Sequence, residues 1–144
     1  MDEPCIRVRN LTKTFGGRTV VDDLSFAVEK GQVFALMAAL LLSRGATVFE
    51  ENIFENRYRH VDELIRMGAA IRVSGRVAVV TGVETLCGAV VRCTDLRGGA
   101  ALCVAALAAE GETHISEISH IDRGYEDIAR DLRDLNADII RIET

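Results

Sequence analysis

Hydrophobic positions recur with two different periods between residues 35 and 142, and this mixture of periods predicts a fold of helices and strands. Apolar runs rich in Ala and Leu predict helices at residues 35–43 and 101–109. Spacings of three and four residues predict two further amphipathic helices. The first places Val61, Leu64, Ile65 and Gly68 on one face, and the second does the same with Ile128, Leu132 and Leu135.

Shorter segments with partial alternation predict strands between these helices. The predicted strands are residues 47–53, 70–73, 77–81, 90–93, 113–118 and 138–142. The residues expected to end the helices are Gly45, Gly68, Gly111 and Asn136, since each type tolerates the left-handed backbone that follows many helices. The predicted order is helix, strand, helix, strand, strand.

This order occurs twice, because the sequence contains an internal repeat. GATVFEENIFENRYRHVDELIRMGAAIRV aligns with GETHISEISHIDRGYEDIARDLRDLNADIIRI, and upstream ALMAALLLSRG aligns with ALCVAALAAEG. Gly45 and Gly111 are 66 residues apart, as are Arg57 and Arg123. A period of that length is one supersecondary unit and exceeds that of the common solenoids. The sequence therefore predicts an α/β unit repeated about a pseudo-axis.

Residues 1–36 do not fit the repeat. The segment CIRVRNLTKTFGGRTVVDDLSFAVEKGQVFAL predicts a β-rich start with turns at Gly16-Gly17 and at Gly31. The change of composition between residues 31 and 37 is the candidate junction between two parts of the chain.

Composition and charge narrow the possible partners. The 144 residues are 49% hydrophobic and 27% charged, which predicts a globular domain with a core. The net charge of -5 and the lack of a basic run argue against nucleic-acid binding. A small anion remains compatible, since a few converging arginines can hold one.

The longest apolar run, residues 33–42, is too short for a membrane helix, which needs about twenty residues. It also lies too far into the chain, without a basic leader, for a signal peptide. The sequence thus predicts a cytoplasmic protein with no membrane segment.

The cysteines show no spacing typical of a metal site. Cys5, Cys87, Cys93 and Cys103 form no CxxC pair, and the three histidines stand at no recognised ligand spacing from them. We expect reduced thiols inside a core, with a metal site or a nucleophile as the alternatives. No metal or cofactor is predicted.

Three motifs in residues 37–144 carry a family resemblance: ENIFENRYRHVDELIRMGA, GVETLCGAVVRCTDLR and HIDRGYEDI. In this order and spacing they resemble the C-terminal end of the UDP-N-acetylglucosamine 1-carboxyvinyltransferases, a branch of the enolpyruvyl transferase family. The resemblance implies an α/β fold, part of an inside-out α/β barrel of repeated βαβαββ units. The implied reaction transfers enolpyruvyl from phosphoenolpyruvate to UDP-N-acetylglucosamine in peptidoglycan precursor synthesis, and both substrates are small molecules.

The resemblance also implies site residues. Arg97 and Arg123 match arginines at the phosphoenolpyruvate end, Arg57 matches another arginine of the cleft, and Asp95 matches an acidic residue beside them. Ile53 falls where the family touches the nucleotide sugar. The alternatives are structural: Arg57 and the Asp122-Arg123 pair begin helices and pair with carboxylates, and Ile53 belongs to the core.

The parts that the family needs for turnover are not matched. The slot of the catalytic Asp falls at about Gly31, where no carboxylate stands, and none of the cysteines lies in the family's loop motif. The family's N-terminal lysine and arginine have no counterpart here. The resemblance therefore implies no catalytic residue in this chain, and we expect it to be inactive alone.

Residues 5–36 resemble the opening of an ABC-transporter ATPase up to the strand before its phosphate loop. That resemblance implies that Phe15 stacks on adenine, and the alternative is a strand-end core residue. MAALLLSRG stands where a G-x-x-x-x-G-K-[ST] loop is expected, so ATP hydrolysis is not predicted. An ABC-subunit fragment and a chimeric fragment without activity remain the competing hypotheses.

Overall fold

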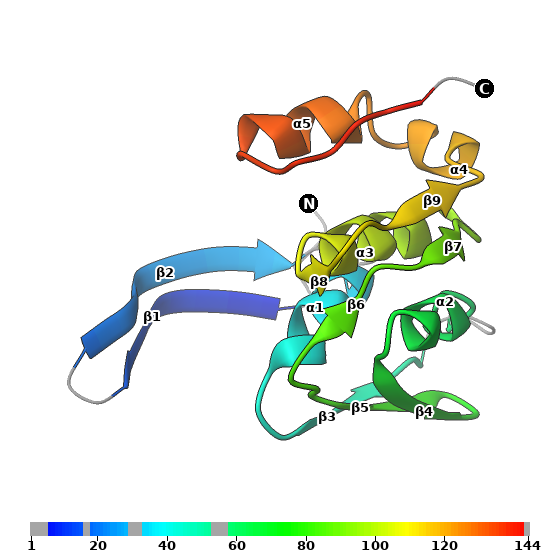
Figure 1. The fold of residues 1–144 in the computed structure, drawn as a ribbon. Coiled ribbons are helices and arrows are strands. Elements are labelled where there is room, and N and C mark those ends of the chain that lie inside the picture. The colour runs from blue at the N-terminus through cyan, green and yellow to red at the C-terminus, as the bar shows by residue number, and fades with distance from the viewer. Residues whose placement is uncertain (1–5, 16–17, 29–32, 53–57, 143–144) are drawn as a thin grey trace. The chain divides into compact units, whose positions relative to one another are not determined.

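A computed structural model describes residues 6–15, 18–28, 33–52 and 58–142 of the chain. The chain divides into two compact units, Met1–Val33 and Phe34–Thr144. The first unit consists of the strands β1 (Ile6–Phe15) and β2 (Arg18–Val28), which pair antiparallel as a hairpin (Figure 1). The predicted β-rich start is thus confirmed, while Gly16, Gly17 and Gly31 lie outside the described residues.

The first repeat copy forms a three-stranded antiparallel sheet with helices. Its elements are α1 (Val33–Ala39), the 3₁₀ turn η1 (Leu40–Leu42), β3 (Ala46–Glu50), α2 (Val61–Arg66), β4 (Ala70–Ser74) and β5 (Val77–Thr81). Strand β5 lies in the centre and pairs with both β3 and β4. The predicted order of helix, strand, helix, strand, strand is confirmed for this copy.

The second copy is preceded by two short strands with which its own strands pair. The two preceding strands are β6 (Leu86–Cys87) and β7 (Val90–Arg92). The elements of the copy are α3 (Leu96–Ala106), β8 (Ala109–Glu110), β9 (His114–Ser116), α4 (Ser119–Asp122) and α5 (Ile128–Asp134). Strands β6 and β8 pair in parallel, and so do β7 and β9 (Figure 1). Helix α3 makes the connection that parallel pairing requires. The fold is α/β, as predicted.

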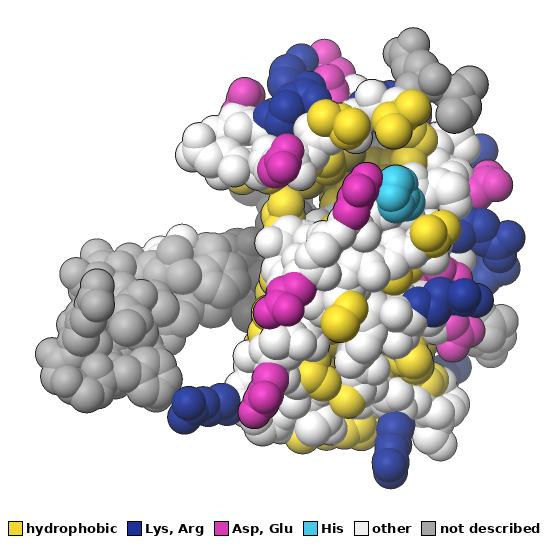
Figure 2. All heavy atoms as spheres, viewed as in Figure 1, with side chains coloured by type: hydrophobic (Ala, Val, Ile, Leu, Met, Phe, Trp, Pro, Cys, Tyr) yellow, Lys and Arg dark blue, Asp and Glu magenta, His cyan; other side chains and the backbone are white. Residues whose placement is uncertain are grey.

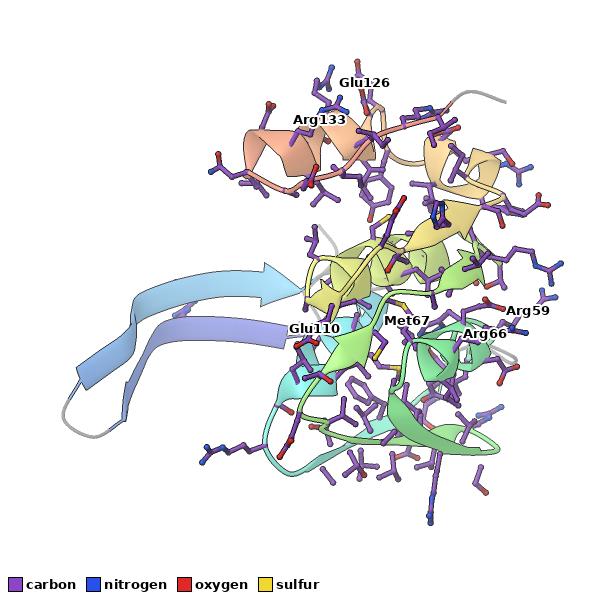
Figure 3. All side chains as sticks on the ribbon, in the orientation of Figure 1. Arg59, Arg66, Met67, Glu110, Glu126 and Arg133 are labelled. Carbon is purple, nitrogen blue, oxygen red and sulfur yellow. The ribbon has the colours of Figure 1, made fainter. Side chains whose placement is uncertain are left out.

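The core of the second unit lies between its helices and strands. Its largest fully buried side chains are Met37, Leu41, His60, Leu64, Met67, Val80, Leu86, Val91, Cys93, Leu102 and Ile121. On the face predicted for this helix, Val61 and Leu64 are buried, whereas Ile65 is 46% exposed. Met67 is buried in its place and lies between α2 and β6, whereas Arg59 and Arg66 point away from the strands (Figure 3). Helix α2 ends at Arg66, and the buried Met67 is its C-cap residue.

Both copies end their second helix in the same way. Gly68 and Asn136 have left-handed backbone, with φ of 93° and 66°. The next amide donates back to the last turn in each copy: Ala69 N to Leu64 O at 3.1 Å, and Ala137 N to Leu132 O at 3.0 Å. This six-to-one bond defines a Schellman cap. The predicted left-handed caps are confirmed, and the repeat extends to individual backbone hydrogen bonds.

The predicted strand at residues 138–142 is not formed. Among the described residues no strand pairs with this segment, whereas its counterpart β4 pairs with β5. A strand exists only through its ladder, so a suitable pattern without a partner stays irregular. Figure 2 shows hydrophobic side chains at the surface near the C-terminal end of the described chain, and Leu135, which was predicted to share a face with Ile128 and Leu132, is 77% exposed.

Candidate functional site

The first turn of α3 is the place where the second motif meets the other two. Asp95 precedes the helix with extended backbone and caps it. Its Oδ1 accepts hydrogen bonds from the amides of Arg97, at 3.0 Å, and Gly98, at 2.8 Å. Two of the amides that a helix start leaves without partners are thereby satisfied. One oxygen of the Asp95 carboxylate is therefore engaged in fixing the helix that carries Arg97.

Gly98 faces the first motif. A Cβ added to Gly98 would lie 2.9 Å from Cβ of His60, which is fully buried just before α2. Carbon atoms do not approach that closely without displacement. The starts of α2 and α3 therefore come together at a distance that only glycine allows.

Gly99, in α3, faces the α4 segment, and Gly124, which follows α4, faces the start of α3. A Cβ on Gly99 would overlap Cys93 Sγ and lie 2.6 Å from Cγ1 of Ile121, on α4. A Cβ on Gly124 would lie 2.6 Å from Cδ2 of Leu96. The HIDRG segment is thus packed directly on the start of α3. Close packing explains the Gly98-Gly99 pair, which helix propensity alone does not.

These contacts bring Arg97 and Arg123 onto adjoining turns. Leu96 precedes Arg97, Gly124 follows Arg123, and Leu96 packs on Gly124. Arg97 is half-buried in the first turn of α3, while Arg123 is exposed at the end of α4. Arg57 and Ile53 lie outside the described residues. Of the residues predicted for the site, the structure therefore brings together Arg97, Arg123 and Asp95.

Tyr58, the residue that follows Arg57, is held in place by its hydroxyl group. Its hydroxyl lies 3.2 Å from the carbonyl oxygens of both Phe49 and Arg76, and it donates its one proton to either. Burial, with Glu51 and Glu50 nearby, raises the pKa of Tyr58. A neutral hydroxyl is therefore maintained, and it ties the end of the ENRY segment to strand β3 and to the turn between β4 and β5.

An ion pair fixes the residue before Arg123. Arg141 Nη1 lies 2.8 Å from Oδ1 of Asp122, and its Nη2 lies 2.9 Å from Oδ2. The hydrogen bonds from Arg141 lower the pKa of Asp122. The alternative that Asp122 and Arg123 begin a helix is wrong, because Asp122 is the last residue of α4 and Arg123 is its C-cap residue. The next helix, α5, begins after Asp127, whose side chain accepts from the amide of Arg130 at 2.9 Å.

The three cysteines within the described residues are one exposed thiol and two buried ones, and Cys5 lies outside those residues. Cys93 and Cys103 lie with Ile121 in a hydrophobic cluster, as expected, whereas Cys87 is exposed and its predicted burial is wrong. Burial raises the pKa of Cys93, and raises that of Cys103 to about 11. Among the described residues no group of three His, Cys, Asp or Glu side chains is placed to hold a metal ion.

Several residues of this site escaped sequence reasoning. His60 and Gly124 act through packing, and Arg141 through a pair 19 residues distant in sequence. The glycine directly after each motif arginine, in IDRG and TDLRGG, was the sequence signal that could have indicated this close packing.

No described helix is long and apolar enough to span a membrane.

The α/β unit and the packing of the three motif segments agree with the known proteins that the chain matches. Residues 18–132 match the family described as EPSP synthase (3-phosphoshikimate 1-carboxyvinyltransferase). The chain therefore belongs to the EPSP synthase family of enolpyruvyl transferases. The match begins at the first residue of β2 and so includes residues 18–36.

Two similar relatives within the family share one name. The UDP-N-acetylglucosamine 1-carboxyvinyltransferase of Zymomonas mobilis is 57% identical over 106 residues, covering 74% of this chain and 25% of that protein. The UDP-N-acetylglucosamine 1-carboxyvinyltransferase 3 of Caldanaerobacter subterraneus is 52% identical over 117 residues, covering 81% and 28%. The chain thus spans about a quarter of the length of these relatives.

Solved structures agree on the fold. The enolpyruvyl transferase NikO from Streptomyces tendae matches 77% of this chain and 26% of its own, with a TM-score of 0.70 and 33% identity. EPSP synthase from Acinetobacter baumannii matches 96% of this chain and 37% of its own with a TM-score of 0.69, at 14% identity. At that identity the second match supports the fold alone.

Proposed function

We propose that residues 37–144 supply the phosphoenolpyruvate-binding end of a transferase that passes enolpyruvyl to UDP-N-acetylglucosamine, in the cytoplasm, for peptidoglycan precursor synthesis. The observation that carries the proposal is the contact of Leu96 with Gly124, which brings the segments of Arg97 and Arg123 together. The names of the relatives at 57% and 52% identity supply the acceptor.

The chemistry of the site suits a small dianion. Phosphoenolpyruvate carries a phosphate and a carboxylate, and an arginine fork makes two parallel hydrogen bonds to either group. We assign Arg97 and Arg123 to these groups, with Arg57 as a third cation. Asp95 holds the start of α3 in place for Arg97, and Ile53 is assigned to the nucleotide sugar.

These 144 residues alone are proposed to bind and not to turn over. Turnover needs an acid and a base placed on the reacting atoms, and no carboxylate stands at the Gly31 slot. Residues 1–36 are proposed to form a separate segment ahead of the transferase part. The ABC-ATPase resemblance of that segment stays a sequence prediction, since no observation in the described structure supports ATP binding.

A ligand titration tests the proposal. Phosphoenolpyruvate, then UDP-N-acetylglucosamine, is added to ¹⁵N-labelled chain while amide spectra are recorded. We expect saturable shifts at Arg97, Gly98 and Arg123. Replacement of Arg97 or Arg123 by Ala should weaken phosphoenolpyruvate binding by about tenfold or more, since hydrogen bonds to charged groups are worth about 1.5–3 kcal/mol.

The matched control is Arg130→Ala, which removes one exposed positive charge from α5 and should leave the affinity unchanged. A titration without shifts, or equal losses in all three variants, would reject the proposed site. Adding the remainder of a relative's chain and measuring phosphate release then tests for turnover, which the variants of Arg97 and Arg123 should abolish.

A further inference from the structure

The turn that carries Arg123 is short and has little support of its own. Helix α4 has four residues, Ser119–Asp122, and no side chain caps its start. A single turn is not stable in isolation, because ordering its backbone costs more than its few hydrogen bonds return. The orientation of Arg123 must therefore come from contacts between α4 and other parts of the chain.

Besides the contact of Gly124 with Leu96, two contacts on neighbouring residues of α4 support that orientation. Ile121 is 2% exposed and packs with Cys93 and Cys103. Asp122 is held by Arg141 through two parallel hydrogen bonds of 2.8 and 2.9 Å. A two-point pair between a planar guanidinium and a carboxylate fixes direction as well as distance. The packing of Ile121 fixes where the turn lies, and the ion pair fixes its rotation.

Arg141 reaches Asp122 from a segment that is itself anchored. The left-handed cap at Asn136 ends α5, and Arg133 Nη1 lies 3.4 Å from the carbonyl oxygen of Ile139. On the other side of α5, Ile128 and Leu132 pack against the cluster that contains Ile121. The segment of Arg141 and helix α4 are therefore both held by contacts with α5.

We propose that Arg141 is a positioning residue for the anion site: through Asp122 it holds the α4 turn so that the Arg123 guanidinium faces the phosphate or carboxylate of the ligand. The identity of the ligand rests on the proposed function. Arg141 acts without touching the ligand, and the segment after α5 thereby becomes part of the binding machinery.

The location of the pair makes this role separable from stability. The side chains of Arg141 and Asp122 are 39% and 38% exposed. Water and salt screen such pairs, which therefore add little to the free energy of unfolding. Loss of the pair should thus change ligand affinity and the local order of Arg123 without a matching loss of thermal stability.

The test compares Arg141→Ala with Arg130→Ala. Arg130 pairs with Asp131 at 3.5 Å, is also half-exposed and lies on α5, so its removal changes the net charge equally and leaves Asp122 untouched. Two quantities are measured: the dissociation constants of phosphoenolpyruvate and inorganic phosphate, and the ¹H–¹⁵N nuclear Overhauser effects of amides 119–124. Arg141→Ala should weaken binding by at least about fivefold, because misplaced groups lose positioning energy.

Arg141→Ala should also lower the Overhauser effect at Arg123, and Arg130→Ala should change neither quantity. Arg141→Lys, which keeps the charge and loses the fork, should restore part of the affinity. The double variant Asp122→Asn/Arg141→Ala should bind the anions no more weakly than either single variant, since the two side chains act as one unit. Equal effects of Arg141→Ala and Arg130→Ala, or an unchanged Overhauser effect at Arg123, would overturn the inference. If the unaltered chain binds neither anion, the proposed function fails, and the Overhauser effect still decides whether Arg141 positions Arg123.

Discussion

Leu96 and Gly124 are in such close contact that a Cβ on Gly124 would lie 2.6 Å from Cδ2 of Leu96. The two residues flank the motif arginines Arg97 and Arg123, and they join the start of α3 to the end of α4. Each arginine is thereby placed by a neighbour in this contact, the half-buried Leu96 or Gly124, so the charged side chain itself remains available for a ligand. Gly98 and Gly99 are in similarly close contact with their neighbours. A single methyl group added at any of these glycines should therefore disturb the site.

Gly99→Ala should destabilise the protein, although the same change in an exposed helix stabilises by about 1 kcal/mol. The new methyl group would meet Cys93 Sγ and Ile121, and overpacking of a core costs about 1–3 kcal/mol. Urea unfolding measures the sign directly. Cys93→Ala in the same chain should recover part of the loss, and a more stable Gly99→Ala variant would show that α3 and α4 are not in contact.

Asp95→Ala should lower the free energy of unfolding by about 1 kcal/mol, because it removes the cap of α3. Asp95→Asn keeps an acceptor oxygen and should lose much less. The comparison separates capping from ligand binding: if phosphoenolpyruvate affinity falls in Asp95→Ala and is kept in Asp95→Asn, the side chain acts through the helix. Affinity that falls equally in both would assign the negative charge a direct role.

Asn136→Gly should be neutral or slightly stabilising, whereas Asn136→Ala should cost about 1 kcal/mol, because residue 136 has a φ of 66°. Gly68→Ala is the matched change in the other copy, at a φ of 93°, and should cost a similar amount. Thermal unfolding of the three variants provides the measurement. A harmless Asn136→Ala would mean that α5 does not end in the left-handed cap.

Cys87 should react with iodoacetamide in the folded protein while Cys93 and Cys103 do not, since only Cys87 of the three is exposed. Peptide mapping after labelling at neutral pH reports each site, and labelling in urea should modify all three. Protection of Cys87, or rapid labelling of Cys103, would contradict the structure.

The raised pKa of Cys103 also predicts a pH dependence of stability. Its thiol titrates at about 11 in the folded chain against an ordinary value of 9.0, so the folded state keeps a proton that the unfolded state loses. This contribution is fully present below pH 9 and is lost as the pH rises to about 11. The free energy of unfolding should therefore fall over that range, and the fall should be smaller in Cys103→Ala.

The pattern of the chain was sufficient for most of the local structure. The 66-residue repeat, the helices, the hairpin strands and the left-handed caps at Gly68 and Asn136 follow from period and residue type, because these features depend on neighbours within a few residues. The motifs also identified the family and named Arg97, Arg123 and Asp95. What those residues do was accessible only by resemblance.

Tertiary contacts decided the rest. Residues 138–142 have a strand pattern and form no strand, since a ladder needs a partner that the pattern does not specify. Met67 replaced Ile65 in the core, because burial depends on which neighbour covers the helix end. Gly98, Gly99 and Gly124 look unfavourable or neutral in sequence and become necessary once α2, α3 and α4 converge. The pairing of Arg141 with Asp122 joins residues 19 positions apart, and only the folded chain brings their charges to 2.8 Å.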